Sequence, residues 1–224
     1  MSMLTNLDLI RRVPLFAMLT PHQLASLTTA VSKRHFKRGE VIVKQGAKSD
    51  FFYIILAGRA RVLMTDGKSR EVILASLQQG DYIGEMSMID NQPHSASVEA
   101  EVQTDVLILG RDEFNYCLNG NPAMAEALMQ GLVKRLRSAD EHIGSLAMLG
   151  VYDRVAKVLL GCAVSDGDHK MVIREKISRQ NIAKMVGASR EMVSRVMRDL
   201  EDQGFIETRD GGSIVVHERR STPR

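Results

Sequence analysis

The chain has few of the residues that build cross-links or metal centres. Only two cysteines, Cys117 and Cys162, occur among its 224 residues. Two thiols exclude a disulfide framework and cannot supply the four thiolates of an iron–sulfur cluster, and this scarcity is typical of a reducing cytoplasm. The six histidines are scattered without ligand spacing, so we expect no metal site and no haem.

Long apolar runs and catalytic motifs are also missing. No apolar run approaches the ~18 residues that span a membrane, and the first 16 residues carry charges instead of the apolar core of a signal peptide. The sequence contains no nucleophile–base motif, no phosphate-transfer loop and no set of metal ligands. We therefore expect a cytoplasmic protein that is not an enzyme, has no covalent cofactor and does not bind membranes.

What the chain does contain is a basic surplus at one end. Its net charge is +3, and the whole surplus lies in residues 151–224, whereas residues 1–150 carry equal numbers of basic and acidic side chains. A basic segment suits a polyanionic partner. A surplus of this size is only weak support, because it lies within ordinary surface variation.

The pattern along the chain predicts an N-terminal helix followed by a β-rich region. Residues 14–31 have helical periodicity, and Thr20-Pro21 is a suitable helix start. Between residues 35 and 110, short β-rich runs alternate with glycines and turn residues. Many short strands at such spacing predict a compact β-barrel or β-roll.

Residues 122–149 predict one long helix, with Pro122 in its first turn. Its apolar residues recur in steps of four and three, which is a heptad pattern. This pattern favours a homodimer that pairs through the helix at 125–146, and the alternative is that the stripe packs on the chain's own barrel. The stripe consists of Ala125, Met129, Leu132, Leu136, Ala139, Ile143 and Leu146.

The C-terminal segment predicts a winged helix–turn–helix. A helix at 152–164 is followed by a break at 165–168, and two further helices joined at Gly187 are expected within 177–203. Two short strands at 205–206 and 213–216, joined by a glycine turn, would form the wing. We expect the tail at 217–224 to be disordered.

The second helix of this pair carries the residues best suited to reading DNA. Arginines such as Arg190 and Arg195 can donate two hydrogen bonds to guanine, and a carboxylate such as Glu191 can accept from cytosine in the major groove. The serines and the arginine at the helix starts, Ser178, Arg179 and Ser189, are expected to hold phosphates. The alternative is a solvated helix in which Glu191 and Arg195 form an i,i+4 ion pair.

The run SRQNIAKMVGASREMVSRVMRDLEDQGFI resembles the DNA-binding motif of the Crp/Fnr family of bacterial transcription regulators. The resemblance extends over nearly the whole chain and implies an α+β fold with a cyclic-nucleotide-binding β-roll, a long dimerisation helix and a winged helix–turn–helix. It divides the chain into an effector-sensing domain at 1–120, a dimerisation helix at 121–150 and a DNA-binding domain at 151–224. It also implies double-stranded DNA with a TGTGA-N6-TCACA palindrome as a partner, and RNA polymerase as another.

A second segment, residues 84–98, resembles the family's phosphate-binding cassette, in which backbone amides hold the phosphate of a cyclic nucleotide. The resemblance implies that the Glu holds the ribose hydroxyl and that an Arg late in the cassette pairs with the phosphate. Here His94 occupies the position of that Arg, and a neutral imidazole would lose much of a charge-assisted contact. The expected ligand-binding residues of the cassette are Gly84, Glu85, Met86, Ser87, His94, Ser95 and Ala96.

Three other residues bear on which nucleotide binds. In place of the Thr-Ser pair that meets adenine in the cyclic-AMP receptor branch, the long helix has Ala139-Asp140, and a carboxylate suits the two donors of guanine better. Arg59 and Arg61 share a strand face and could hold a phosphate or a guanine, or simply face solvent. These departures favour cyclic di-GMP as the effector, with cyclic AMP or cyclic GMP next and another effector or none as the remaining choice.

A function of another class is also open. Nucleotide cassettes serve as regulatory modules of enzymes, and such a module would bind its nucleotide without recognising a DNA sequence. The triplet of Arg190, Glu191 and Arg195 argues against this alternative.

Overall fold

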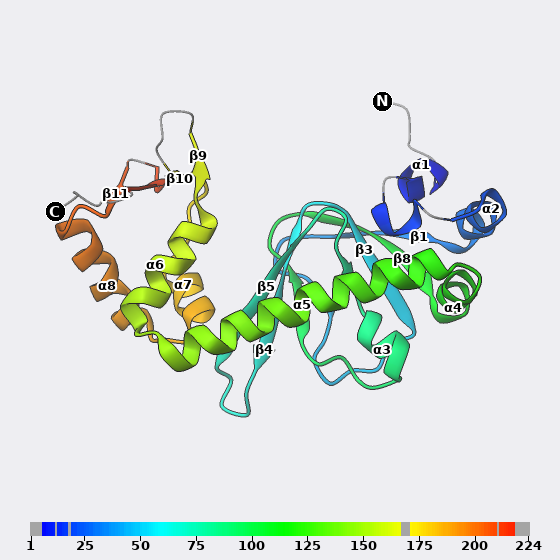
Figure 1. Ribbon diagram of the computed structural model, residues 1–224, viewed down its shortest axis with the longest axis horizontal. Coiled ribbons are helices and arrows are strands. Elements are labelled where there is room, and N and C mark those ends of the chain that lie inside the picture. The colour runs from blue at the N-terminus through cyan, green and yellow to red at the C-terminus, as the bar shows by residue number, and fades with distance from the viewer. Residues whose placement is uncertain (1–5, 12, 18, 167–170, 210, 218–224) are drawn as a thin grey trace. The chain divides into compact units, whose positions relative to one another are not determined.

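The computed structural model describes residues 6–11, 13–17, 19–166, 171–209 and 211–217, which form two compact units (Figure 1). The division between the units falls between Leu136 and Arg137, inside the long helix α5 (Pro122–Met148). The helix is therefore shared by both units instead of forming a separate part at 121–150.

The first unit contains a β-roll made of two antiparallel sheets of four strands each. One sheet has the order β1-β8-β3-β6 and the other has the order β2-β7-β4-β5. The strands are β1 (Ser32–Phe36), β2 (Val41–Val43), β3 (Phe51–Ala57), β4 (Arg59–Thr65), β5 (Glu71–Gln78), β6 (Tyr82–Ile83), β7 (Ser97–Ala100) and β8 (Thr104–Gly110).

Strand β3 shows why this roll has two apolar layers. Its alternate residues point to opposite faces, so Tyr53 and Ile55 pack inside the roll, whereas Phe52 and Ile54 pack against the helices outside it. The strand is therefore apolar on both faces, which explains its continuous hydrophobic run. The helices that cover its outer face are α1 (Asn6–Arg11), α2 (Pro21–Ala30), α4 (Arg111–Asn119) and the first turns of α5.

The predicted helix at 14–31 is wrong in its first half. Pro14–Phe16 form one 3-10 turn, and α2 begins only at Pro21. Thr20 caps α2 in a capping box with Gln23, and this reciprocal pair of hydrogen bonds sets the start of the helix. The Thr20-Pro21 signal thus located the start correctly, while the apolar residues before it belong to a turn that packs into the core.

The second unit contains the winged helix–turn–helix, made of α6 (Val151–Cys162), α7 (Arg179–Val186), α8 (Arg190–Asp202) and a small sheet. The wing strands β11 (Ile206–Thr208) and β12 (Ile214–Val216) lie where the sequence predicted them. Two further strands, β9 (Val164–Ser165) and β10 (Met171–Ile173), complete the sheet in the order β11-β12-β10-β9. No pattern in the sequence predicted these two strands, and only an interruption after the preceding helix, at 165–168, was expected. Of the tail predicted to be disordered, 218–224 lie outside the described residues.

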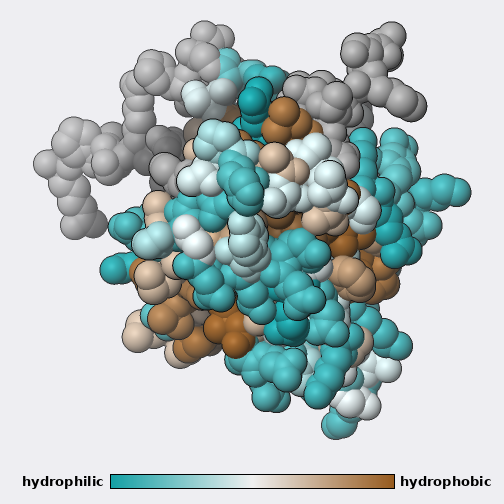
Figure 2. All heavy atoms as spheres, turned by 90° about the vertical axis from the view of Figure 1, so that its right-hand side faces the viewer, coloured by the Kyte–Doolittle hydropathy of each residue, from teal (hydrophilic) through white to brown (hydrophobic). Residues whose placement is uncertain are grey.

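The outer surface is mixed in character. Seen from the side of α2 and α4, it is largely hydrophilic with smaller apolar patches (Figure 2). None of the described helices is both long and apolar enough to cross a membrane.

Candidate nucleic-acid interface and nucleotide pocket

The two helices of the helix–turn–helix begin at serine caps. The hydroxyl oxygen of Ser178 accepts a hydrogen bond from the backbone N–H of Asn181 at 3.1 Å, and Ser189 caps α8 in the same way through Met192. Between the helices, Gly187 has a φ of 64°, the left-handed conformation that glycine adopts without strain. The sequence had assigned both serines to phosphate binding. Their oxygens are engaged as caps, so only their hydroxyl protons remain for a phosphate.

Helix α8 presents one apolar face and one polar face. Val193, Val196, Met197 and Leu200 are buried in the core of the unit. Arg190, Glu191 and Arg195 are consequently exposed on the other side. Among the described residues, no ion pair joins Glu191 to Arg195. The structure therefore lacks the i,i+4 pair that was the alternative to DNA reading.

A basic cavity of about 330 Å³ lies at the start of α7, next to the wing. Arg179 and Arg190 line it together with Lys176, which the sequence had not singled out. The side chain of Lys176 lies against Gly212 of the wing turn, where an added Cβ would meet it at 3.0 Å. The spacing of Lys176, Arg179 and Arg190 in the sequence matches no motif, so only the folded structure shows that they line one cavity.

The cassette forms around the short helix α3 (Glu85–Asp90). Gly84 precedes it with a φ of 92°, and a Cβ at this position would lie 2.8 Å from the carbonyl oxygen of Phe51. Both the left-handed conformation and the close approach require glycine here. The guanidinium of Arg111 donates to the carbonyls of Ser87 and Met88 at 3.1 and 2.9 Å, which fixes the last turn of α3. No sequence signal pointed to Arg111.

Glu85 is the most deeply buried charge of the cassette, at 2% exposure. Arg135 of α5 donates to its carboxylate at 2.7 Å, donates to the carbonyl of Tyr82 at 2.6 Å, and lies over the ring of Tyr82. Burial raises the pKa of Glu85 above its ordinary value, while the guanidinium of Arg135 acts in the opposite direction. Sequence reasoning gave Arg135 no part in the cassette, although a buried carboxylate requires such a partner.

His94 is buried beside Glu85 and differs from a phosphate-binding arginine in its charge. Its Nδ1 lies 3.1 Å from the hydroxyl of Ser87, and its Nε2 is buried without a hydrogen-bond partner among the described residues. Burial lowers the pKa of His94. A protonated imidazole could replace part of the missing arginine's contact with a phosphate, and this environment works against protonation.

One pocket of about 110 Å³ brings the expected cassette residues together. All seven of them line it, and so does Arg135. The lining residues named from the sequence are Gly84, Glu85, Met86, Ser87, His94, Ser95 and Ala96.

The remaining expected ligand contacts are not part of this pocket. Arg61 forms an ion pair with Glu99 at 2.7 Å, and Arg59 lies 3.9 Å from Glu101. The neighbouring Val62 lines the pocket instead, because successive residues of a strand point to opposite faces. Neither Arg59 nor Arg61 lines this pocket, so their part in ligand binding stays a prediction. Asp140 is exposed on the part of α5 that belongs to the second unit.

The heptad stripe of α5 is exposed. Met129, Leu136 and Ile143 are 58–63% accessible. The residues that pack α5 onto the first unit are instead Met124 and Leu128, which are almost fully buried. Within the first unit, Met129 and Leu136 thus do not pack on the barrel, whereas Ala125 and Leu132 are partly buried. Groups of three or more His, Cys, Asp or Glu side chains that could hold a metal ion do not occur among the described residues.

Comparison with known proteins matches both units. The family model of the cyclic nucleotide-binding domain matches residues 33–121, and that of the Crp-like helix-turn-helix domain matches residues 153–221. The cAMP-activated global transcriptional regulator CRP of Salmonella typhimurium is 36% identical over 182 residues, which are 80% of this chain and 86% of that protein.

Two further relatives extend the likeness. The CRP-like cAMP-activated global transcriptional regulator of Mycobacterium tuberculosis is 27% identical and covers 97% of this chain and 98% of its own length. Among solved structures, the c-di-GMP-responsive global regulator CLP of Xanthomonas campestris has a TM-score of 0.77 at 21% identity, covering 89% of this chain and all of that one. At this identity, the structural likeness shows the fold alone.

Proposed function

Because this chain belongs to the Crp family of DNA-binding transcription regulators, we propose that it acts as a homodimer that reads a TGTGA-like palindrome under the control of a cyclic nucleotide. Its relatives are regulators and not enzymes. The observation that carries the proposal is the exposure of Arg190, Glu191 and Arg195 together on α8, opposite its buried face.

The proposed readout assigns each of these side chains a base. Arg190 and Arg195 donate to the O6 and N7 of guanine, and Glu191 accepts from the N4 of cytosine. Lys176 and Arg179, which line the cavity beside the wing, hold phosphates and so contribute affinity without sequence preference. RNA polymerase is the partner that membership of the family suggests for the DNA-bound protein.

The exposed stripe of α5 supports the homodimer. Seven apolar or small side chains at heptad spacing leave a seam that an identical helix can cover. Pairing two copies places two recognition helices on one DNA, which suits half-sites about one helical turn apart.

For the effector, the geometry favours a cyclic mononucleotide over cyclic di-GMP. The guanine argument rested on Asp140, Arg59 and Arg61, and neither arginine lines the cassette pocket. The relatives from Salmonella typhimurium and Mycobacterium tuberculosis are cAMP-activated. Asp140 keeps cyclic di-GMP as the second candidate, because a carboxylate matches the N1–H and N2–H of guanine.

The test is DNA binding by fluorescence anisotropy with a TGTGA palindrome and a scrambled duplex, each with cyclic AMP, cyclic GMP, cyclic di-GMP or no nucleotide. We expect a preference for the palindrome that a cyclic mononucleotide changes. Glu191→Ala should relax discrimination at one base pair by about 1–3 kcal/mol, whereas Arg179→Ala should weaken binding to both duplexes alike. Equal losses for both variants on both duplexes would refute the assigned roles.

The same experiment separates the alternative of a regulatory module that does not read DNA. Calorimetric titration would then show nucleotide binding, while the two duplexes would bind with equal, salt-dependent affinity. A response to cyclic di-GMP alone would leave the DNA-binding proposal intact and overturn the choice of a mononucleotide.

A further inference from the structure

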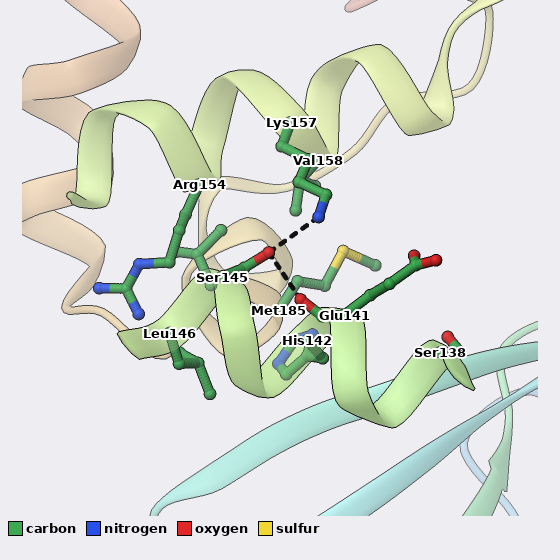
Figure 3. A pocket seen from close by; sticks show the side chains of 10 residues that line it. Ser138, Glu141, His142, Ser145, Leu146, Arg154, Lys157, Val158 and Met185 are labelled. Carbon is green, nitrogen blue, oxygen red and sulfur yellow. Dashed lines mark hydrogen bonds between the residues drawn. The ribbon is translucent and has the colours of Figure 1, made fainter. Parts of the chain in front are cut away.

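A second cavity lies within the DNA-binding unit, and it shares no residue with the cassette pocket. It has a volume of about 230 Å³ and lies between the last turns of α5, the first turns of α6 and the end of α7 (Figure 3). Its lining residues are Ser138, Glu141, His142, Ser145, Leu146, Arg154, Lys157, Val158, Met185 and Val186.

Two nitrogens of this cavity are buried without a partner. Within the described part of the chain, neither Nε2 of His142 nor Nε of Arg154 has a hydrogen-bond partner. Buried polar atoms in folded proteins are almost always hydrogen-bonded, so two such atoms on residues of one cavity wall are unusual. Both atoms are closed to solvent, so they add polar character to this wall and are not assigned as ligand contacts.

Lys157 provides a fixed positive charge at the same cavity. Its ammonium donates to the hydroxyl of Ser145 at 2.8 Å, and that hydroxyl donates to the backbone carbonyl of Glu141 at 2.9 Å (Figure 3). These two hydrogen bonds hold the ammonium over α5. Among the described residues, they use one of the three N–H donors of Lys157. The other two donors remain available to a bound anion.

The rest of the lining sets the chemical class of the ligand. Leu146, Val158, Met185 and Val186 give the cavity apolar walls. Arg154 and Lys157 outweigh the single carboxylate of Glu141, so the charge balance favours an anion. The volume lies below the ~300–1,000 Å³ of pockets for drug-sized ligands, which points to a small molecule.

The cavity does not coincide with the heptad stripe of α5. Ser138, Glu141, His142 and Ser145 lie outside the stripe, and only Leu146 belongs to both. Pairing of two helices through the stripe would therefore leave most of the lining accessible. The site is thus compatible with the proposed dimer without depending on it.

We propose that this cavity binds a small organic monoanion, a carboxylate with a short apolar body. The carboxylate pairs with the ammonium of Lys157, and the apolar body lies against Val158 and Met185. This site is additional to the cyclic-nucleotide site.

The test is calorimetric titration of the full-length protein with three matched probes. Hexanoate carries both the charge and the apolar body, acetate only the charge, and 1-hexanol only the apolar body. We expect saturable binding of hexanoate, at least about tenfold tighter than binding of either other probe, because both features contribute. The absence of saturable hexanoate binding, or an equal affinity for acetate or 1-hexanol, would overturn the proposal.

Two lysine variants locate the site. Lys157→Met keeps the length of the side chain and removes its charge, so hexanoate should bind at least roughly tenfold more weakly. Lys184→Met changes a lysine of α7 that does not line the cavity and should bind hexanoate like the wild type. Unchanged affinity in Lys157→Met, or equal losses in both variants, would place hexanoate elsewhere. Circular dichroism confirms that each variant is folded.

Discussion

The cassette and the recognition helix treat their charged residues in opposite ways. In the cassette, Glu85 is buried and paired with Arg135, and Ser87 is hydrogen-bonded to His94. On α8, Arg190 and Glu191 are exposed, and the structure's described residues hold neither in an ion pair. The first region pairs its buried charge internally, whereas the second leaves its charges for a partner.

The difference follows from the cost of burying charge. A buried carboxylate is strongly destabilising unless it is paired, so the cassette must supply Arg135 from a distant part of the chain. An exposed side chain retains its hydration and needs no internal partner. Substitutions in the cassette should therefore affect both folding and ligand binding, whereas substitutions of the exposed charges of α8 should affect binding alone.

The largest expected effect tests an exposed surface, the apolar stripe of α5. Ile143→Asp places a carboxylate in the proposed seam of α5, where pairing would bury it in both copies. We expect the dimer to weaken by about 3 kcal/mol or more, roughly a hundredfold in its dissociation constant, because two like charges lose their hydration together. Sedimentation equilibrium measures the change.

Lys134→Asp is the control for this variant. Lys134 is exposed on the same helix but lies outside the heptad stripe, so the dimer should persist. An unchanged mass for Ile143→Asp would place the interface elsewhere, and the exposed stripe would then need another partner.

The next largest effect tests the cassette, the region with the buried charge. Gly84→Ala forces a residue with a Cβ into a φ of 92° and places that Cβ 2.8 Å from the carbonyl of Phe51. We expect a destabilisation of about 1–3 kcal/mol and weaker nucleotide binding, because the cassette must shift to relieve the contact. Urea denaturation and calorimetry measure the two effects. Gly67→Ala is the matched control, since nothing lies within 4 Å of its added Cβ.

A smaller effect is expected at the start of the recognition helix. Ser189→Ala removes the cap that accepts from Met192 and should reduce stability by about 1 kcal/mol. Ser194→Ala lies inside the same helix, where its hydroxyl donates only to the carbonyl of Arg190, and it should be nearly neutral. Thermal unfolding compares the two, and equal losses would show that the cap is not what sets the start of α8.

The sequence located features that depend on local pattern. The turn at Gly187, the stripe of α5 and the Thr20 cap follow from residue spacing and from the conformational needs of single residues. The cassette was found through family resemblance, and all seven of its expected residues line one pocket. These features are contiguous in the chain, which is why a single sequence contains them.

What the sequence missed depends on contacts between distant segments. Arg135 reaches Glu85 from a position 50 residues away, and no spacing rule connects the two. Arg59 and Arg61 do not line the pocket, because their shared strand face is the one opposite to Val62. Periodicity shows which residues share a face, but only the paired sheet shows which face is inside.

The smallest expected effect concerns the uncharged state of His94. Burial lowers its pKa from the ordinary 6.5, so the unfolded chain takes up the proton more readily than the folded one. The stability of the wild type should therefore be fully present above about pH 6.5 and fall as the pH drops below it. His94→Gln does not titrate, so its fall in stability should be shallower.

Urea denaturation at about pH 7.5 and about pH 5 measures this difference. His22→Gln is the matched control, because it makes the same substitution at an exposed histidine outside the cassette. If the slopes of His94→Gln and the wild type coincide, burial does not keep His94 neutral. The cassette would then be able to hold a protonated imidazole, and the contrast with the exposed charges of α8 would be weaker at this residue.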